Sequence, residues 1–503
     1  MNKNVLILSV LSLTLGFKSF SQTIKADKIK TLSEAKLLES LDEYKGFLAL
    51  PNDGNYPEQI DTNLNWCNSK FQSLGFKTQE LTSKSIPHLF AEKIIDPNLP
   101  TVLFYMQIDG QPVDSSKWNQ ESPFIATLKN NDTPIPWESL QKEINEDWKI
   151  FARSASDSKG PAMCLITALE ILQKEGIKPS FNIKAIMDFQ EELGSPTIAE
   201  LVNNNRKLLE CSYLLIMDGT RHISNLPTLT FGARGIATIR LEVFGGKENL
   251  HSGQYGNYAP NPAFLLSRLL SSMKDENGKV LVKDYYKGIK ITKKDRSEFA
   301  KIPEDMADLN RELGIAQAEK VGKSYQEAMQ YPSLNIRGLS AGWTGKEVRT
   351  LIPSSALAEI DLRLVKETDG EIAVERIKKH IESQGFHLTN KEPTEEERAA
   401  YPKIASFSYR IGSKPFLTPL NSPMGYWLSK AMNRLYGEGN YVKVRATGGS
   451  QPMAPFIESL DVPAVSLRIP NPDNNIHGPN ENMRIGNYKE GIEMVLAVLT
   501  EGL

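Results

Sequence analysis

The sequence predicts an α/β protein with a mainly parallel sheet, interrupted by an inserted α+β domain of ferredoxin-like order. With 503 residues, the chain is too long for one compact domain. Up to about residue 232, short apolar runs alternate with helical periodicities, which is typical of parallel strands covered by helices. Between residues 233 and 412 the elements follow the order β-α-β-β-α, which is typical of a small antiparallel sheet with two helices on one face.

The first segment has helices whose apolar residues are three and four apart, and strands that are continuous apolar runs. The elements expected there are, in order, helix 34–48, helix 60–74, strand 101–107, helix 160–175, strand 181–189, helix 197–209 and strand 212–218.

The inserted segment has strands that alternate apolar and polar residues, which indicates half-exposed strands. Its expected elements are strand 236–243, helix 261–274, strand 333–342, strand 356–365 and helix 370–384. A polar, charged stretch over residues 275–331 is an elaboration within it. The α/β pattern then returns with a helix over 424–435 and a strand over 464–467.

The N-terminus has the layout of a secretory signal peptide. Lys3 precedes an apolar run over residues 5–17, and Ser19 and Ser21 supply the small residues of a cleavage site. The run is short for a transmembrane helix; the alternative is an uncleaved anchor. We expect cleavage after Ser21 and a periplasmic or secreted protein that has no membrane attachment afterwards.

The composition favours a soluble globular protein and gives no sign of nucleic-acid binding. The net charge is −2, and the basic runs are short and mixed with acids. The three cysteines, Cys67, Cys164 and Cys211, have neither zinc-site nor disulfide-framework spacing.

Acids follow the predicted strands, one strand after another. Each alone suits a helix cap, a turn or a solvated loop, but the carboxyl ends of parallel strands meet at one edge of a sheet. Carboxylates crowded there repel one another unless cations neutralise them, and carboxylates with a histidine suit zinc, manganese or a similar ion. The candidates are Gln107, Asp109, Asp157, Glu191, Glu192, Asp218 and His477.

The chain resembles the M20 family of metallopeptidases and amidohydrolases, and within it the carnosinase-like dipeptidases. Ten stretches carry the resemblance, in the family's order, between residues 109 and 482. They are DGQPVDSSKWNQESPF, ARSASDSKGP, FQEELGSP, MDG, FGARG, NLHSG, RTLIP, EIDLRLV, TGGS and HGPNEN. After the predicted signal peptide (1–21), the resemblance implies a zinc-peptidase-like catalytic domain in two parts (22–232 and 413–503) and a dimerisation and lid domain (233–412).

The resemblance also implies two metal ions bridged by Asp157. Glu192 and His477 would complete one site, and Asp218 would hold the other ion together with the residue at position 107.

Two acids would have other roles. Glu191 would be the general base, taking a proton from the bridging water as it attacks an amide carbonyl. Asp109 would orient the ligand at position 107.

The lid would supply substrate contacts. His251 would reach the active site of the partner subunit in a homodimer and stabilise the oxyanion. Thr350 and Arg363 would hold a substrate carboxylate, which suits the arginine fork. Arg363 alternatively belongs only to the exposed face of its strand, and Thr350 to a loop. Ser450 would contact the substrate from the catalytic side.

One ligand position departs from the family pattern, which is His-x-Asp where this sequence has Gln107-Ile108-Asp109. Gln107 could ligate through its carbonyl oxygen while its NH₂ donates to Asp109. Such a site would bind zinc more weakly and would be comparatively better suited to manganese or magnesium. Alternatively, only the Glu192/His477 site fills. A third interpretation, a catalytically silent binding protein, is disfavoured because a buried acidic cluster is destabilising without cations.

The sequence therefore predicts an exported hydrolase that cleaves an amide in a small carboxylate-bearing substrate by Glu191-assisted attack of metal-bound water. A dipeptide is the first expectation. An N-acyl amino acid, or a silent ligand-binding dimer, is the alternative. The cofactor expected is zinc, with manganese or cobalt as other candidates, at one or two ions per subunit.

Overall fold

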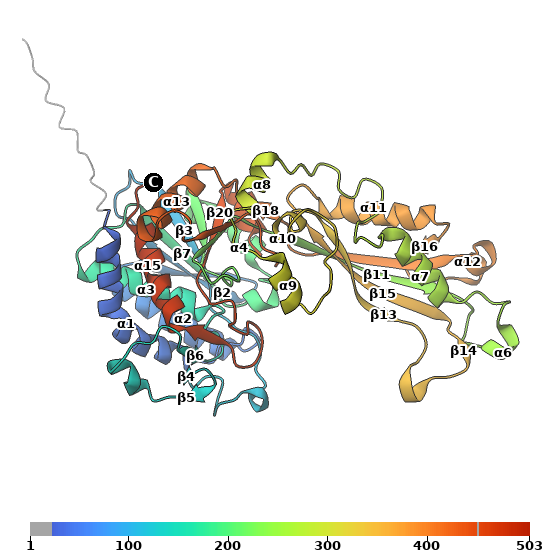
Figure 1. Ribbon diagram of the computed structural model, residues 1–503, viewed down its shortest axis with the longest axis horizontal. Helices are drawn as coiled ribbons and strands as arrows, with labels where there is room; N and C mark the ends of the chain where they lie inside the picture. Colours follow the sequence, from blue (N-terminus) through green and yellow to red (C-terminus); the bar gives the residue numbers. More distant parts are fainter. Residues whose placement is uncertain (1–22, 450–451) are drawn as a thin grey trace, which may run out of the picture.

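The computed structural model describes residues 23–449 and 452–503. The predicted signal peptide and Ser450 lie outside these residues. Figure 1 shows an α/β body and, extending from it, an elongated sheet domain formed by the insertion. Among the described residues, no helix combines the length and apolar character that crossing a membrane requires.

The α/β body is built on an eight-stranded sheet of order β1-β2-β7-β3-β8-β20-β9-β19. The four central strands, β7, β3, β8 and β20, are mutually parallel, as predicted, whereas β2 and β9 flank them antiparallel. The strands are β1 (Lys77–Ser83), β2 (Ile86–Lys93), β3 (Thr101–Gln107), β7 (Asn182–Asp188), β8 (Tyr213–Ile216), β9 (Thr228–Thr230), β19 (Val442–Val444) and β20 (Ala464–Arg468).

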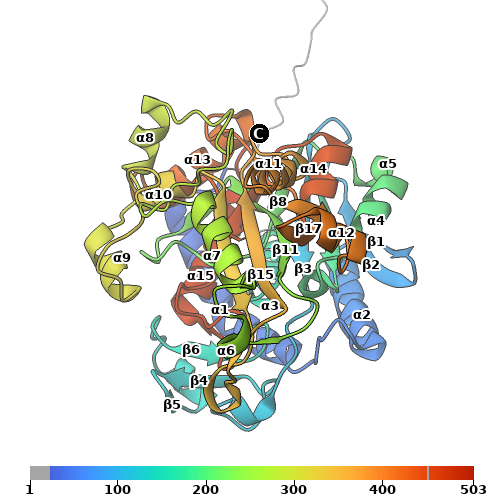
Figure 2. The same cartoon turned by 90° about the vertical axis from the view of Figure 1, so that its right-hand side faces the viewer.

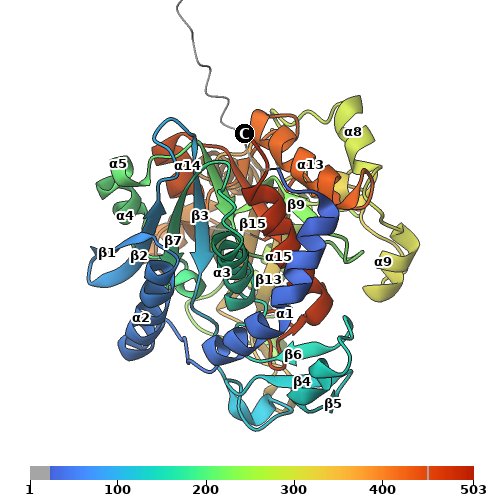
Figure 3. The ribbon, with the colours of Figure 1, turned by 90° about the vertical axis from the view of Figure 1, so that its left-hand side faces the viewer.

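Helices cover both faces of this sheet. One face carries a layer of packed helices (Figure 3), namely α1 (Ala26–Leu48), α2 (Pro57–Ser73), α3 (Lys159–Lys174), α13 (Pro423–Tyr436) and α15 (Ile485–Leu499). The other face is covered by α4 (Ile198–Asn204), α5 (Arg206–Leu209) and α14 (Ala454–Leu460). Helix α15 is not predicted by the sequence pattern, because this helix is buried on nearly every side and its apolar residues form no stripe.

A smaller sheet of order β21-β6-β4-β5 lies beside the body. Its strands are β4 (Thr127–Asn130), β5 (Thr133–Pro134), β6 (Lys149–Phe151) and β21 (Asn482–Arg484). The pairing of Asn482 with Phe151 joins the chain just after His477 to the chain just before Asp157. Two distant candidate residues are thereby brought to one place.

The inserted domain has a five-stranded sheet of order β13-β15-β11-β17-β16, with α7 and α11 packed on one face (Figure 2). The predicted β-α-β-β-α order is present, but β16 runs parallel to β17, and β17 was not predicted. These elements are β11 (Gly235–Phe244), α7 (Pro262–Met273), β13 (Ser333–Ser340), β15 (Ser355–Leu364), α11 (Gly370–Ser383), β16 (His387–Thr389) and β17 (Ile404–Ile411).

Short elements surround this sheet and join it to the body. They are β10 (Gly232–Ala233), β12 (Leu250–His251), α6 (Ser252–Tyr255), α8 (Lys293–Phe299), α9 (Met306–Glu312), α10 (Tyr325–Ala328), β14 (Leu351–Ile352), α12 (Glu395–Ala400) and β18 (Phe416–Leu417). In Figure 1, α6 and β14 lie at the end of the inserted domain that is remote from the body.

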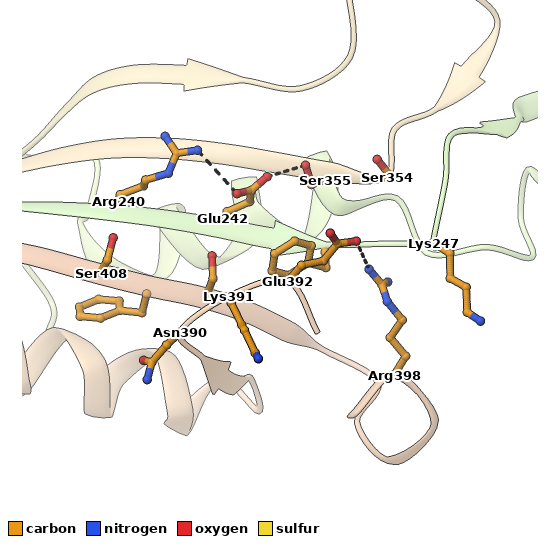
Figure 4. Close-up of a pocket in the computed structure, with 13 residues that line it drawn as sticks. Arg240, Glu242, Lys247, Ser354, Ser355, Asn390, Lys391, Glu392, Arg398 and Ser408 are labelled. Atoms are coloured by element: carbon orange, nitrogen blue, oxygen red, sulfur yellow. Dashed lines mark hydrogen bonds and ion pairs between the residues drawn. The ribbon is translucent and has the colours of Figure 1, made fainter. Parts of the chain in front are cut away.

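The strands β11, β15 and β17 also border a polar hollow of about 400 Å³ (Figure 4). Its two arginines lie near acids that also line it: Arg240 lies 3.7 Å from Glu242, and Arg398 lies 3.5 Å from Glu392. Ser355 donates to Glu242 at 2.7 Å. Because both arginines already have acidic partners, they give no reason to infer an anionic ligand in the hollow.

Candidate active site

The predicted candidates meet at the carboxyl edge of the central parallel strands. A cavity of about 450 Å³ opens there. Its lining includes Gln107, Gln111, Asp157, Glu191, Glu192, Asp218, Arg468 and His477. Gln107 ends β3, the glutamate pair follows β7, and Asp218 follows β8, so the convergence expected from parallel strand ends is present.

Asp157, Glu192 and His477 form a cluster that suits a metal ion. One ligand atom from each lies within 4.8 Å of the others. His477 Nε2 lies 3.1 Å from an Asp157 oxygen and 3.6 Å from Glu192 Oε2. Glu192 Oε1 is buried and has no hydrogen-bond partner within the described ranges. A buried carboxylate oxygen without a donor is costly, and a bound cation would satisfy it.

The ionisation of the cluster also indicates a missing positive charge. Burial raises the pKa of Glu191 well above its usual range, and the carboxylates of Asp218 and Asp157 raise it further. Burial, followed by Asp157, raises the pKa of Glu192 to about 8. Its hydrogen bond to Asp157 raises the pKa of His477 to about 9. The site as it stands attracts cations, which is what a divalent metal ion would exploit.

Asp109 holds the glutamate pair. Its two carboxylate oxygens accept hydrogen bonds from the backbone N–H groups of Glu191 and Glu192, at 2.9 and 3.0 Å. The expected contact with Gln107 differs from the prediction: the Gln107 amide donates to the backbone oxygen of Asp109, at 3.5 Å, rather than to its carboxylate. Asp109 therefore positions the predicted base and its metal-ligand neighbour.

A buried carboxylate that the sequence analysis did not single out fixes the same loop from behind. Asp188 accepts hydrogen bonds from the backbone of Gln190 and the hydroxyl of Tyr105, both at 2.9 Å, and from the hydroxyl of Ser195. His88 lies 3.4 Å from it. Since Gln190 and Ser195 bracket the glutamate pair, Asp188 limits how far that loop can move.

The lid candidates do not reach this cavity. His251 is exposed at the end of β12, and Thr350 is exposed in the adjoining loop, both at the remote end of the inserted domain (Figure 1). Arg363, in β15, lies 3.7 Å from Asp361. None of the three lines the cavity. The roles predicted for His251 and Thr350 therefore require a second chain or a rearrangement of the lid.

The family model for Peptidase family M20/M25/M40 matches residues 103–501. The chain belongs to this family. As an M20 peptidase it is a hydrolase, and the resemblance seen in the ten sequence stretches is confirmed.

Known M20 proteins resemble the chain over most of its length. The Beta-Ala-His dipeptidase of Mus musculus is 27% identical over 424 residues, which cover 82% of this chain and 80% of that protein. The Cys-Gly metallodipeptidase of Schizosaccharomyces pombe is 25% identical, with 81% and 80% covered. The solved structure of an M20 family metallo-carboxypeptidase from Sulfolobus solfataricus has a TM-score of 0.73 at 27% identity, covering 92% of this chain and 99% of that one. The two-domain α/β architecture is that of M20 peptidases.

In this M20 peptidase, Glu481 is a further positioning residue that the sequence analysis missed. Its carboxylate accepts hydrogen bonds from the backbone N–H groups of Ser154, Ser156 and Asp157, at 2.8–2.9 Å, and pairs with Arg153 at 2.7 Å. It follows His477 by four residues, so it ties the His477 loop to the Asp157 loop. The motif HGPNEN contained it, but nothing in one sequence marks which carboxylate of a motif faces inward.

Arg468, like Asp188 and Glu481, was not predicted from the sequence. It ends β20, so the strand-end rule applied to the predicted strand 464–467 would have found it. It brings a positive charge to the side of the cavity where the resemblance implies a second metal ion. The Asp157–Glu192–His477 cluster suits a metal ion, whereas the Gln107–Asp218 side, with a neutral amide and a guanidinium, does not.

Proposed function

We propose that this M20 peptidase is an exported metal-dependent dipeptidase that hydrolyses the amide bond of a small substrate with a free carboxylate. The observation that carries the proposal is the position of Glu191 beside the Asp157–Glu192–His477 cluster, in one cavity at the edge of the sheet. The dipeptidase relatives in mouse and fission yeast support the substrate class. Export follows from the N-terminal signal pattern, and a mature chain that begins at Gln22 would verify it.

The residues divide the chemistry between them. A divalent cation held by Asp157, Glu192 and His477 would acidify water and polarise an amide carbonyl. Glu191 would take the proton of the attacking water and pass it to the leaving amine. Asp109 keeps Glu191 in place through the backbone N–H.

The substrate class can be tested with paired substrates. We expect turnover of dipeptides with added Zn²⁺, Mn²⁺ or Co²⁺ and its loss in excess chelator. The same dipeptides with an amidated C-terminus should be poor substrates if an arginine such as Arg363 binds the carboxylate. Initial rates are measured on dipeptides, their amides, N-acyl amino acids and longer peptides.

Each result separates one alternative. Preference for N-acyl amino acids would replace the dipeptidase by a deacylase of the same mechanism. Shortening of longer peptides from the C-terminus would indicate a carboxypeptidase. An absence of turnover with every ion would favour the silent ligand-binding dimer.

We also propose a homodimer in which His251 serves the partner's active site. His251 directly precedes α6, which lies at the end of the inserted domain remote from the body (Figure 1), so in this proposal a partner subunit uses its side chain. The variants His251→Ala and Glu191→Gln should each be inactive alone. After unfolding and refolding together they should regain roughly a quarter of wild-type activity, since half of randomly mixed symmetric dimers are hybrids with one working site.

Size-exclusion chromatography with light scattering gives the oligomeric state in the same experiment. Mixing His251→Ala with a second chain that carries both substitutions is the matched control, because no site in that mixture is complete. Activity of the isolated His251→Ala variant close to wild type would contradict the shared-site proposal.

A further inference from the structure

Arg468 and Asp218 leave the central sheet side by side. Strands β20 and β8 pair in parallel, with Ser466 opposite Ile216. Arg468 and Asp218 each follow two residues later, so they arrive at the same edge. Alternate residues of a strand face the same side, and both side chains line the candidate cavity.

The guanidinium is packed tightly against the backbone that follows Asp218. Arg468 is 6% exposed. Space for it exists because residue 219 is glycine: a Cβ atom there would lie 1.2 Å from Arg468 Nη1. Gly219 also has a φ of +91°, a conformation that glycine adopts without strain. The turn at Gly219 is therefore shaped to admit a cationic side chain.

The carboxylates are what stabilise this buried charge. Burial lowers the pKa of Arg468, and the charges that oppose the shift are those of Asp218 and, less strongly, Asp157. Nη2 has no hydrogen-bond partner in the described part of the chain. An arginine stays protonated even so, and the charges of the two acids offset part of the cost of burying it.

The same place lacks the ligands for a second metal ion. Within residues 23–449 and 452–503, Asp157, Glu192 and His477 are the one close group of three or more histidine, cysteine or acidic side chains. Gln107, in the position of the expected imidazole, offers a neutral amide, which is a weak ligand for zinc. A divalent cation beside the guanidinium would also be repelled, most strongly at the low dielectric constant of a buried site.

We propose that Arg468 takes the place of the second metal ion, so that each chain binds a single divalent cation, at Asp157, Glu192 and His477. Gln107 and Arg468 are then complementary. The imidazole of the family pattern is absent at position 107, and Arg468 supplies positive charge on the same side of the cavity. The inference deepens the proposed function, because the single ion is taken to be the one used in hydrolysis.

Metal stoichiometry tests the proposal without reference to turnover. Purified apoprotein is dialysed against excess Zn²⁺ and then against metal-free buffer, and zinc per chain is measured by elemental analysis. We expect one ion for the wild type. The double variant Gln107→His/Arg468→Met restores an imidazole and removes the positive charge, and it should bind two ions. Gln107→His/Arg468→Lys differs only in keeping the charge, and it should stay at one.

Two ions in the wild type, or two in the lysine-containing double variant, would overturn the proposal. If the methionine-containing variant does not fold, titration of wild-type apoprotein with Co²⁺ tests the number of ions instead. The visible absorption should stop rising at one equivalent of Co²⁺ per chain. An end point at two equivalents would overturn the inference. One bound ion with no hydrolysis of any substrate would leave this inference standing and remove the proposed function. Hydrolysis of a dipeptide by a wild-type chain that binds two ions would support the proposed function and remove this inference.

Discussion

Replacing Glu191 with glutamine is expected to lower kcat/KM on a dipeptide by about 10²–10⁴-fold, the usual contribution of a general base. The substitution preserves shape and leaves the backbone N–H that donates to Asp109. It also leaves Asp157, Glu192 and His477, the three metal-ligand candidates, unchanged. The loss should therefore appear in kcat, while zinc per chain stays at the wild-type value.

Steady-state kinetics and elemental analysis of the same sample provide the test. Glu200→Gln, on the exposed side of α4, is the matched control, because it makes the same chemical change away from the cavity. A Glu191→Gln variant that retains its metal and more than a tenth of wild-type kcat would exclude Glu191 as the base, because a general base contributes at least about 10²-fold.

Replacing Glu481 with alanine is expected to have the largest effect on stability. The change leaves Arg153, which is 3% exposed, as a buried charge without its carboxylate, and it deprives three backbone N–H groups of their acceptor. Breaking a buried ion pair in this way costs about 3–5 kcal/mol. The melting transition of the catalytic domain should fall by on the order of 10 °C.

Metal affinity should fall in the same variant, because Glu481 joins the loops of Asp157 and His477. Glu481→Gln keeps the shape and one acceptor oxygen, so we expect a smaller loss. Glu200→Ala is the surface control. Thermal melting by circular dichroism and a zinc titration measure the two effects. A melting temperature within about 2 °C of wild type for Glu481→Ala, equivalent to no more than about 1 kcal/mol, would show that the Glu481 contacts contribute little.

The main strands and the acids at their ends could be predicted because both depend on local pattern. Strand β3 has the predicted limits, and β7 and β8 lie within the predicted runs, since a buried parallel strand is a continuous apolar segment that ends at a polar residue. The general rule that parallel strand ends converge then predicts that Gln107, the Glu191–Glu192 pair and Asp218 lie together, whereas Asp157 reaches them through the pairing of β6 with β21.

Elements without a clear apolar pattern were not predicted. The short strands β4, β5 and β6 have few apolar residues, and β17 was not distinguished from its polar surroundings. Helix α15 was not predicted for the opposite reason, since it is buried on nearly every side and shows no apolar stripe. In each case the element is specified by the neighbours that it packs against rather than by its own periodicity.

By itself, the sequence determined the family, the fold class and the set of acidic and histidine side chains at the cavity, because these depend on residue order and strand periodicity. Only the tertiary structure decided which groups meet. Glu481 and Asp157 are 324 residues apart and share a hydrogen bond. Arg468 and Asp218 line one cavity because β20 lies beside β8 in the sheet. Contacts between segments so distant in the chain follow from sheet order and loop closure, so a single sequence leaves no local signal of them. The balance of charge around the metal site, and with it the number of ions, is therefore set by the folded structure.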